Sequence, residues 1–155
     1  LGRKYAEALD LTVLDQNGKS QVVTMGSYGI GVSRAVAAIA EQTHDEIGLN
    51  WPREIAPADI HIVATGKEAE VFKAALTLAE DLEEKGLRVM FDDRADASAG
   101  VKFKDAELIG IPFIVIVGKA LSEGKVEFRV RRTGEKTEIE LLKAVTEITS
   151  RVLNS

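Results

Sequence analysis

The feature that most constrains the fold is FIVIV at 113–117, a run of five apolar residues that follows Pro112. Such a run is typical of a strand that is buried on both faces of a sheet. A second β-branched run, IHIVAT, lies at 60–65, and LRVMF lies at 87–91. The segments between these runs have the apolar spacing of helices, at 68–85 and 99–109, and each ends at a glycine.

The last third of the chain adds a hairpin and a helix. Residues 125–131 alternate apolar and charged side chains, a turn follows at Thr133-Gly134, and 138–140 are expected to pair antiparallel with this strand at the edge of the sheet. Residues 141–153 have helical spacing. The alternation predicts an α/β fold with three layers, a mixed sheet of about five strands and three helices. The short connections between strands and helices predict right-handed crossovers.

The first 42 residues have a different pattern. LTVL at 11–14 and QVVTM at 21–25 flank Asn17-Gly18, which predicts an antiparallel hairpin. A glycine-rich stretch follows at 26–31, and 32–42 has helical spacing. The segment 43–59 has no sustained period, so we expect a connection there, with a domain boundary inside it and Trp51-Pro52 anchoring it against a domain.

Composition excludes several classes of protein. The chain has 155 residues, no cysteine and a net charge of −5, from 20 basic and 25 acidic residues. These values exclude a disulfide framework and disfavour indiscriminate binding of nucleic acid. His44 and His61 lack metal-ligand spacing, so we expect no metal site. No segment is predicted to enter a membrane, a cytoplasmic location is expected, and the start at Leu1 suggests a piece of a longer protein.

The pattern Gly29-x-Gly31-x-x-Arg34 follows the hairpin. It is not a dinucleotide fingerprint, because the third position is Arg34 and the preceding strands are antiparallel. Glycines at 26, 29 and 31 let a ligand approach the backbone, and a guanidinium can stack on a purine and meet phosphates, as ATP binding requires. The alternative is a tight turn followed by a solvated arginine.

Three stretches resemble bacterial-type prolyl-tRNA synthetases, which are class II aminoacyl-tRNA synthetases. They are VVTMGSYGIGVSR at 22–34, AAIAEQTHDEIGLNWPREIAP at 37–57 and DDRADASAGVKFKDAELIGIPFIVIVG at 92–118. The first two resemble motif 3 with its adjoining helix and linker, and the third resembles the C-terminal anticodon-binding domain. The resemblance implies residues 1–50 from the antiparallel sheet of the catalytic domain, a linker at 51–58 and an anticodon-binding domain at 59–155.

The resemblance also implies roles for the glycine-rich stretch. Arg34 matches the motif 3 arginine, the catalytic residue that binds ATP, and Gly29 and Gly31 match glycines that form the floor of the adenylate pocket. Gly26 and Ser27 fall in the same ATP and amino-acid pocket. Ser27 stands where many members carry a cysteine, so the selectivity for the amino acid is open at this position.

The implied activity belongs to a full-length enzyme. Such an enzyme activates proline with ATP and Mg²⁺, transfers it to proline tRNA and works as a homodimer. Motif 1, motif 2 and the editing insertion of the family would precede Leu1. Since transition-state stabilisation needs all charged groups together, we expect this chain alone to be inactive and to hold no cofactor tightly.

Charge is segregated along the second half. Residues 67–85 hold six acidic residues against three lysines, whereas 119–136 hold six basic residues against three glutamates. Arg94 follows the strand 87–91 and Lys102 lies on the next helix, where both are placed to reach a ligand at the strand ends. The resemblance implies that this region reads guanines of the proline anticodon, so Arg94 and Lys102 are expected to contact bases or phosphates. Lys104 is expected to help, and Glu107 to accept from a base amino group. Asp92-Asp93 are expected to orient Arg94, and the alternative for each charge is a solvated surface position.

Two other functions stay open at this stage. One is a non-catalytic tRNA-binding accessory or regulatory module with the same fold. The intact Gly29, Gly31 and Arg34 favour the enzyme, because such a module has no need of ATP chemistry. The other is a nucleotide-binding α/β protein with no preference for the proline anticodon.

Overall fold

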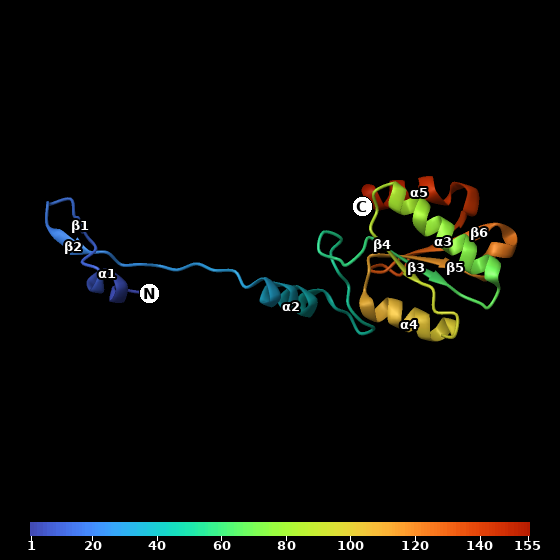
Figure 1. Cartoon of the computed structure of the whole chain (residues 1–155), viewed down its shortest axis with the longest axis horizontal. Helices are drawn as coiled ribbons and strands as arrows, with labels where there is room; N and C mark the ends of the chain where they lie inside the picture. Colours follow the sequence, from blue (N-terminus) through green and yellow to red (C-terminus); the bar gives the residue numbers. More distant parts are fainter. The chain divides into compact units, whose positions relative to one another are not determined.

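The computed structural model describes residues 1–155 as two compact units, Leu1–Val36 and Ala37–Ser155 (Figure 1). The first unit contains α1 (Lys4–Ala8), β1 (Thr12–Leu14), β2 (Ser20–Val22) and the start of α2 (Val32–Thr43). The division falls inside α2. The predicted assignment of 1–50 to a catalytic domain stays a prediction.

The predicted hairpin is present in the first unit. β1 and β2 pair antiparallel, with Thr12 opposite Val22. The Asp15 carboxylate accepts hydrogen bonds from the backbone N–H groups of Asn17 and Lys19, and Gly18 has a φ of 73°, which a glycine adopts without strain. The second strand ends at Val22, earlier than expected, and the short helix α1 was not predicted.

The second unit is built on a mixed five-stranded sheet, as predicted. Its strands are β3 (Ile60–Ala64), β4 (Val89–Asp92), β5 (Phe113–Val117), β6 (Lys125–Val130) and β7 (Lys136–Glu140), in the order β4-β3-β5-β6-β7. β3 pairs in parallel with β4 and β5, whereas β5, β6 and β7 pair antiparallel. The all-apolar strand β5 is therefore central, and every one of its residues is buried.

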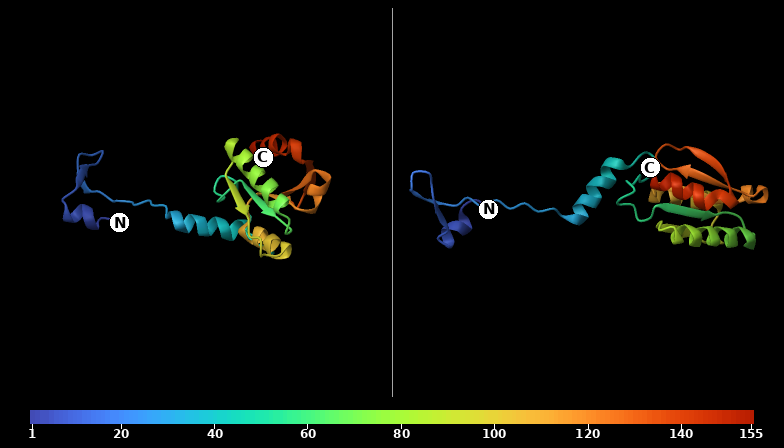
Figure 2. Two further views of the ribbon diagram at one scale, coloured as in Figure 1. Left: turned by 45° about the vertical axis from the view of Figure 1, so that its right-hand side comes forward. Right: turned by 90° about the horizontal axis from the view of Figure 1, so that it is seen from above.

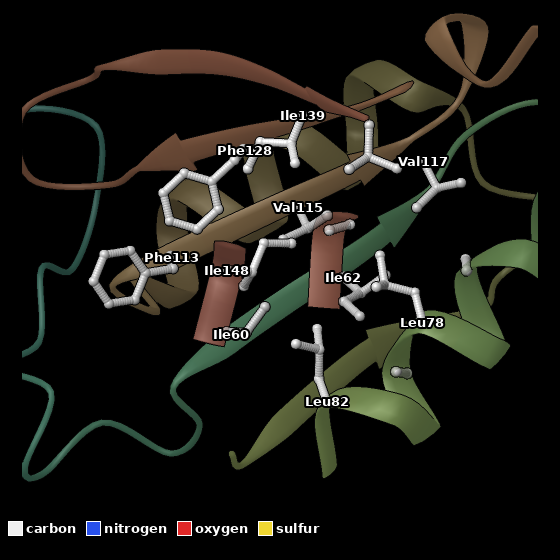
Figure 3. Packing of buried hydrophobic residues seen from close by; sticks show 14 of the residues in the cluster. Ile60, Ile62, Leu78, Leu82, Phe113, Val115, Val117, Phe128, Ile139 and Ile148 are labelled. Carbon is white, nitrogen blue, oxygen red and sulfur yellow. The ribbon is translucent and has the colours of Figure 1, made fainter. Parts of the chain in front are cut away.

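The three predicted helices cover the two faces of this sheet (Figure 2). α3 (Ala69–Glu84) and α5 (Leu141–Leu153) pack on one face around Ile62, Val115 and Phe128 (Figure 3). α4 (Ala99–Ile109) packs on the other face through Ala106 against Val63 and Ile114. The alternation along β3 and β5 sends successive side chains to the two cores. A short 3-10 helix, η1 (Lys119–Glu123), follows β5 and was not predicted.

The connection between α2 and β3 packs on the C-terminal end of α4, within the second unit. Leu49 N donates to Leu108 O at 3.1 Å, and Trp51 Nε1 donates to Ile109 O at 3.0 Å, so Trp51 anchors the connection as predicted. Gly110 has a φ of 75°, and a Cβ there would lie 2.1 Å from Leu49 O. Only glycine allows this close approach.

Three ion pairs hold the ends of the connection. The buried Arg131 guanidinium donates to the Asp45 carboxylate at 2.7 and 2.8 Å. Asp59 accepts from Arg53 and Arg88, and Arg88 also donates to Ala56 O at 2.7 Å. Burial favours the neutral form of Asp59, but the hydrogen bonds from Arg88 and Arg53 outweigh it and lower its pKa to about 2. None of the helices has the length and apolar character needed to span a membrane.

Candidate functional site

A crevice lies where the carboxyl ends of β3 and β5 meet. β3 lies between β4 and β5. α3 connects β3 to β4 on one face of the sheet, and α4 connects β4 to β5 on the opposite face. Open α/β sheets bind ligands at such a switch point. Thr65 N donates to Val117 O at 2.8 Å, and a Cβ on Gly118 would lie 2.1 Å from Thr65 Oγ1. Gly118 therefore lets the two strand ends come together.

A cavity of about 560 Å³ opens at this crevice. The Arg129 guanidinium of β6 lies 5.1 Å from the centre of the Phe103 ring of α4, and both residues are half-buried. Arg129 also pairs with Glu127. Lys119 is exposed at the rim and has no ion pair. The remaining lining residues include Thr65, Ala99, Ile116, Gly118, Ala120, Glu123 and Glu138.

This arrangement combines the groups that recognise single-stranded RNA. A guanidinium stacked on an aromatic ring offers a flat surface for a base, a free lysine attracts phosphate, and carboxylates accept from base amino groups. Arg129 is not among the residues that the sequence pattern predicts as RNA contacts. The positive segment 119–136 was the signal that pointed to it.

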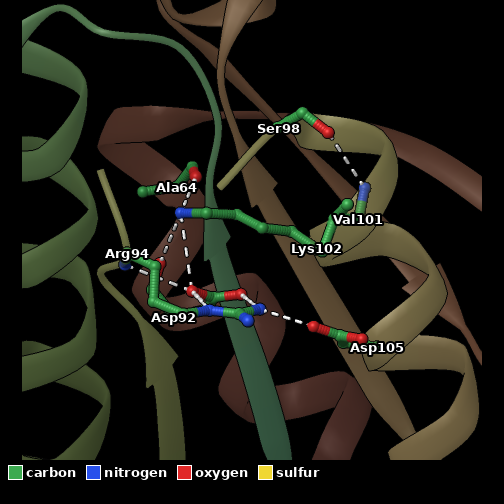
Figure 4. A network of polar contacts seen from close by, with 7 residues as sticks. All are labelled: Ala64, Asp92, Arg94, Ser98, Val101, Lys102 and Asp105. Atoms are coloured by element: carbon green, nitrogen blue, oxygen red, sulfur yellow. Dashed lines mark hydrogen bonds and ion pairs between the residues drawn. The ribbon is translucent and has the colours of Figure 1, made fainter. Parts of the chain in front are cut away.

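Arg94 lies at the end of β4 and is held by carboxylates (Figure 4). Its Nε and Nη2 donate to Asp92 at 2.9 and 2.7 Å, and Nη2 also donates to Asp105 at 2.7 Å. The hydrogen bonds from Arg94 lower the pKa of Asp92 to about 2. Of the two residues predicted to orient Arg94, Asp92 does so, whereas Asp93 makes no ion pair with it. The two carboxylates outweigh the single positive charge, so Arg94 attracts phosphate less than a free arginine does.

The prediction of a surface position for Lys102 is wrong. Lys102 is only 1% exposed, and its Nζ donates to Ala64 O at 2.7 Å and Asp92 O at 3.2 Å. The ammonium also lies 3.5 Å from the Asp92 carboxylate and 5.2 Å from the centre of the Phe72 ring. It satisfies carbonyl groups at the ends of β3 and β4. In this conformation the Lys102 ammonium is enclosed and supports the strand ends, so the predicted contact with RNA would require a different conformation of this side chain.

The other two predicted anticodon contacts lie on α4. Lys104 is exposed and has no ion pair, and Glu107 is half-buried, with its carbonyl oxygen accepting from Arg131 Nε at 3.2 Å. Their contacts with RNA stay predictions. The segment 119–136 presents less free positive charge than its net charge suggests, because Asp45 pairs with Arg131 and Glu138 pairs with Lys125.

The glycine-rich stretch lies in the first unit, before α2. Gly26, Ser27, Gly29 and Gly31 are exposed and form neither helix nor strand, and Tyr28 and Ile30 between them are almost fully exposed. Arg34 is exposed in the first turn of α2 and has no ion pair. The residues predicted for the ATP pocket are thus adjacent along the chain, but the first unit builds no enclosed pocket around them. Their role stays a prediction.

Comparison with known proteins gives consistent matches. A sequence model of the family described as "Anticodon binding domain" matches residues 59–151. The chain is 65% identical over 139 residues to the proline--tRNA ligase of Nocardioides sp., covering 90% of this chain and 24% of that protein. It is 58% identical over 152 residues to the proline--tRNA ligase of Kineococcus radiotolerans, covering 98% of this chain and 26% of that protein. The chain spans about a quarter of the length of these curated relatives.

Solved structures show the same fold. The prolyl-tRNA synthetase from Cryptosporidium parvum complexed with L-proline and AMP matches 99% of this chain and 32% of its own, with a TM-score of 0.71 and 22% identity. The Giardia lamblia prolyl-tRNA synthetase in complex with prolyl-adenylate matches 94% of this chain and 31% of its own, with a TM-score of 0.65 and 25% identity.

Proposed function

Because this chain belongs to the anticodon-binding domain family, we propose that it is the anticodon-binding part of a proline--tRNA ligase and recognises the anticodon loop of proline tRNA. The observation that carries the proposal is the family match over 59–151, together with identities of 58 to 65% to proline--tRNA ligases. The whole enzyme would activate proline with ATP and transfer it to the tRNA.

The crevice between β3 and β5 is the proposed contact surface. Arg129 on Phe103 supplies a stacking surface, and Lys119 supplies an unpaired positive charge. Lys104, Glu107 and Arg94 remain further proposed RNA contacts, although none of them lines the cavity at the crevice. The net charge of the chain, −5, limits nonspecific attraction, so recognition rests on these local groups.

The first unit is proposed to contribute to the ATP and proline pocket of the whole enzyme. Arg34 has a free guanidinium that fits stacking on adenine, and Gly29 and Gly31 leave the backbone open to a ligand. The structure has no group of three or more acidic, histidine or cysteine side chains that could hold a metal. The use of ATP together with Mg²⁺ is proposed for the whole enzyme. A homodimer and a cytoplasmic location complete the proposal.

Match coverage favours the enzyme over an accessory module. The identity to the Kineococcus radiotolerans ligase extends over 98% of the chain, a span that has to include most of the glycine-rich stretch. A module released from ATP chemistry has no need to keep Gly29, Gly31 and Arg34. We expect the 155-residue chain alone to show no ATP–pyrophosphate exchange, and detectable exchange would contradict the proposed division of labour.

RNA binding tests the proposal directly. The proline anticodon stem-loop and a stem-loop with a changed anticodon are titrated against the chain, and we expect tighter binding of the first. Arg129→Ala should weaken binding about fivefold or more, since loss of a stacked base costs about 1–3 kcal/mol. Lys119→Ala should reduce the slope of log K against log salt by about 0.7.

The matched control is Lys85→Ala, which removes an exposed positive charge just after α3. It should leave both the affinity and the salt slope unchanged. Equal affinity for the two stem-loops would refute anticodon recognition. An unchanged affinity in Arg129→Ala would show that the anticodon loop binds elsewhere than at the crevice.

A further inference from the structure

A second cavity, a groove of about 550 Å³, runs along β4 on the face of the sheet that carries α4. α4 packs over β3 and β5 through Ala106, Val63 and Ile114, and β4 is the edge strand beyond them. The α4-facing side of β4 is therefore incompletely covered. Met90 and His61 lie opposite each other in the parallel register, and Leu108 and Ile109 form the wall on α4.

His61 is a polar residue in an otherwise apolar strand. It is 2% exposed, and its imidazole makes no hydrogen bond with the rest of the chain. An unpaired polar group in the interior costs stability, and each one calls for an explanation. Its Nδ1 is enclosed without a partner. Because the ring also lines the groove, Nε2 is the ring nitrogen that faces the groove.

The protonation of His61 follows from its surroundings. Burial lowers the pKa of His61, so the ring is neutral at pH 7. An enclosed N–H without a partner is rarer than an enclosed acceptor without one. The favoured tautomer therefore carries its proton on Nε2, which makes the ring a hydrogen-bond donor toward the groove.

The rim of the groove is acidic. Asp92 and Asp105 are occupied by Arg94, as Figure 4 shows, whereas Asp93 is exposed and has no ion pair. The three carboxylates exceed the Arg94 guanidinium and the Lys102 ammonium beside Asp92 by one negative charge, so the rim repels phosphate and carboxylate ligands. The free Asp93 carboxylate accepts hydrogen bonds. A matching ligand presents an acceptor to His61, a donor to the rim and a flat apolar body to Met90 and Leu108.

We propose that this groove binds an uncharged, amino-substituted nitrogen heterocycle of the nucleobase type, with a ring acceptor on His61 Nε2–H and the amino group on Asp93. The volume lies in the range of small-molecule sites. The Arg94 guanidinium at the rim adds a surface on which the ring stacks. A free nucleoside and a base that is splayed out from bound RNA share this chemistry.

Nucleoside titration of the chain tests the proposal, with the NMR signals of the His61 ring and the Met90 methyl group as readouts. Adenosine should shift both signals with a dissociation constant on the order of millimolar, as expected for a ligand of this size in an open groove. Inosine, which has no amino group, and AMP, which adds a phosphate, should each bind at least fivefold more weakly. This titration does not depend on the proposed tRNA function.

Two variants separate binding from structural support. His61→Phe removes the unpaired nitrogen and keeps a flat ring, so we expect a higher melting temperature together with loss of adenosine binding. Asp93→Asn should bring the affinities for adenosine and inosine together. The control, Asp81→Asn, removes a carboxylate on α3, on the other face of the sheet, and should leave both affinities unchanged.

An RNA arm identifies the source of the base. Shifts of the His61 and Met90 signals with the proline anticodon stem-loop, but not with 10 mM adenosine, would support the groove as a site for an RNA base. Absence of shifts with both ligands overturns the proposal. It is also overturned if His61→Phe retains the affinity of the unmodified chain, or if Asp93→Asn leaves the preference for adenosine over inosine intact.

Discussion

The two units of the chain differ in how much apolar surface each one buries. Within Leu1–Val36 only Ala6 is buried, and Leu9, Leu14, Tyr28 and Ile30 are exposed. Within Ala37–Ser155 two apolar cores fill both faces of the sheet. A segment of 36 residues is too short to bury enough surface for independent stability, whereas 119 residues are sufficient. The contrast indicates that secondary structure alone does not make a stable unit.

Limited proteolysis should show the largest difference. We expect rapid cleavage in the exposed stretch 23–31 and a stable product that begins near Ala37, measured by mass. The connection 44–58 should resist, because Trp51 and Asp45 attach it to the second unit. Trp51→Ala should expose it to cleavage. Survival of residues 1–36 as a protected fragment would remove the contrast between the units.

A pair of identical substitutions sharpens the comparison. Leu82→Ala, at a position that is 0% exposed, should lower the free energy of unfolding by about 2–5 kcal/mol, because it leaves a cavity in the core. Leu14→Ala, at a position that is 72% exposed, should change it by less than about 0.5 kcal/mol. Urea denaturation measures both values. Similar losses at the two positions would show that the first unit shares the stability of the second.

Charged side chains allow a parallel test. Lys102→Met keeps all but the last atom of the side chain's length and leaves the carbonyl groups of Ala64 and Asp92 without their donor, which should cost about 1–3 kcal/mol. Arg34→Met removes an exposed, unpaired charge and should have almost no effect on thermal unfolding. A neutral effect of Lys102→Met would mean that the buried ammonium gives no net stabilisation.

Acid should produce the smallest of these differences. The folded-state pKa of Asp59, about 2, lies below its ordinary value of 3.8, so its stabilising contribution is present above pH 4 and is lost as the pH falls toward 2. Asp59→Asn should therefore reduce the loss of stability between pH 5 and 2.5. Glu7→Gln in the first unit is the control, because that carboxylate is exposed and makes no hydrogen bond or ion pair. An unchanged pH profile in Asp59→Asn would argue against this role.

Most elements could be predicted from local patterns. FIVIV at 113–117 and the helix at 99–109 have the bounds that periodicity and flanking Pro and Gly residues indicate. α1 and η1 were missed because five-residue helices contain too few turns to show a period. The turn at Asn17-Gly18 was found because its chemistry is local.

The candidate site was predicted less well, for a physical reason. Lys102 and Lys104 lie two positions apart on α4, so they point to different sides of the helix, and only one of them is buried beneath the ends of β3 and β4. No local pattern tells the two lysines apart. Similarly, Arg129 and Phe103 are 26 positions apart in the chain and meet only because Arg129 lies opposite Ile114 in the sheet, on the face that α4 covers.

By itself the sequence determined the order of strands and helices, the mixed sheet and the resemblance to prolyl-tRNA synthetases, because these depend on periodicity, turn residues and runs of matching residues. The tertiary structure alone decided which charges are free. It neutralised Arg94 and Arg131 with carboxylates, buried Lys102 and left His61 without a partner. Exposure and pairing depend on contacts between residues distant in the chain, and those contacts exist only once the layers have packed.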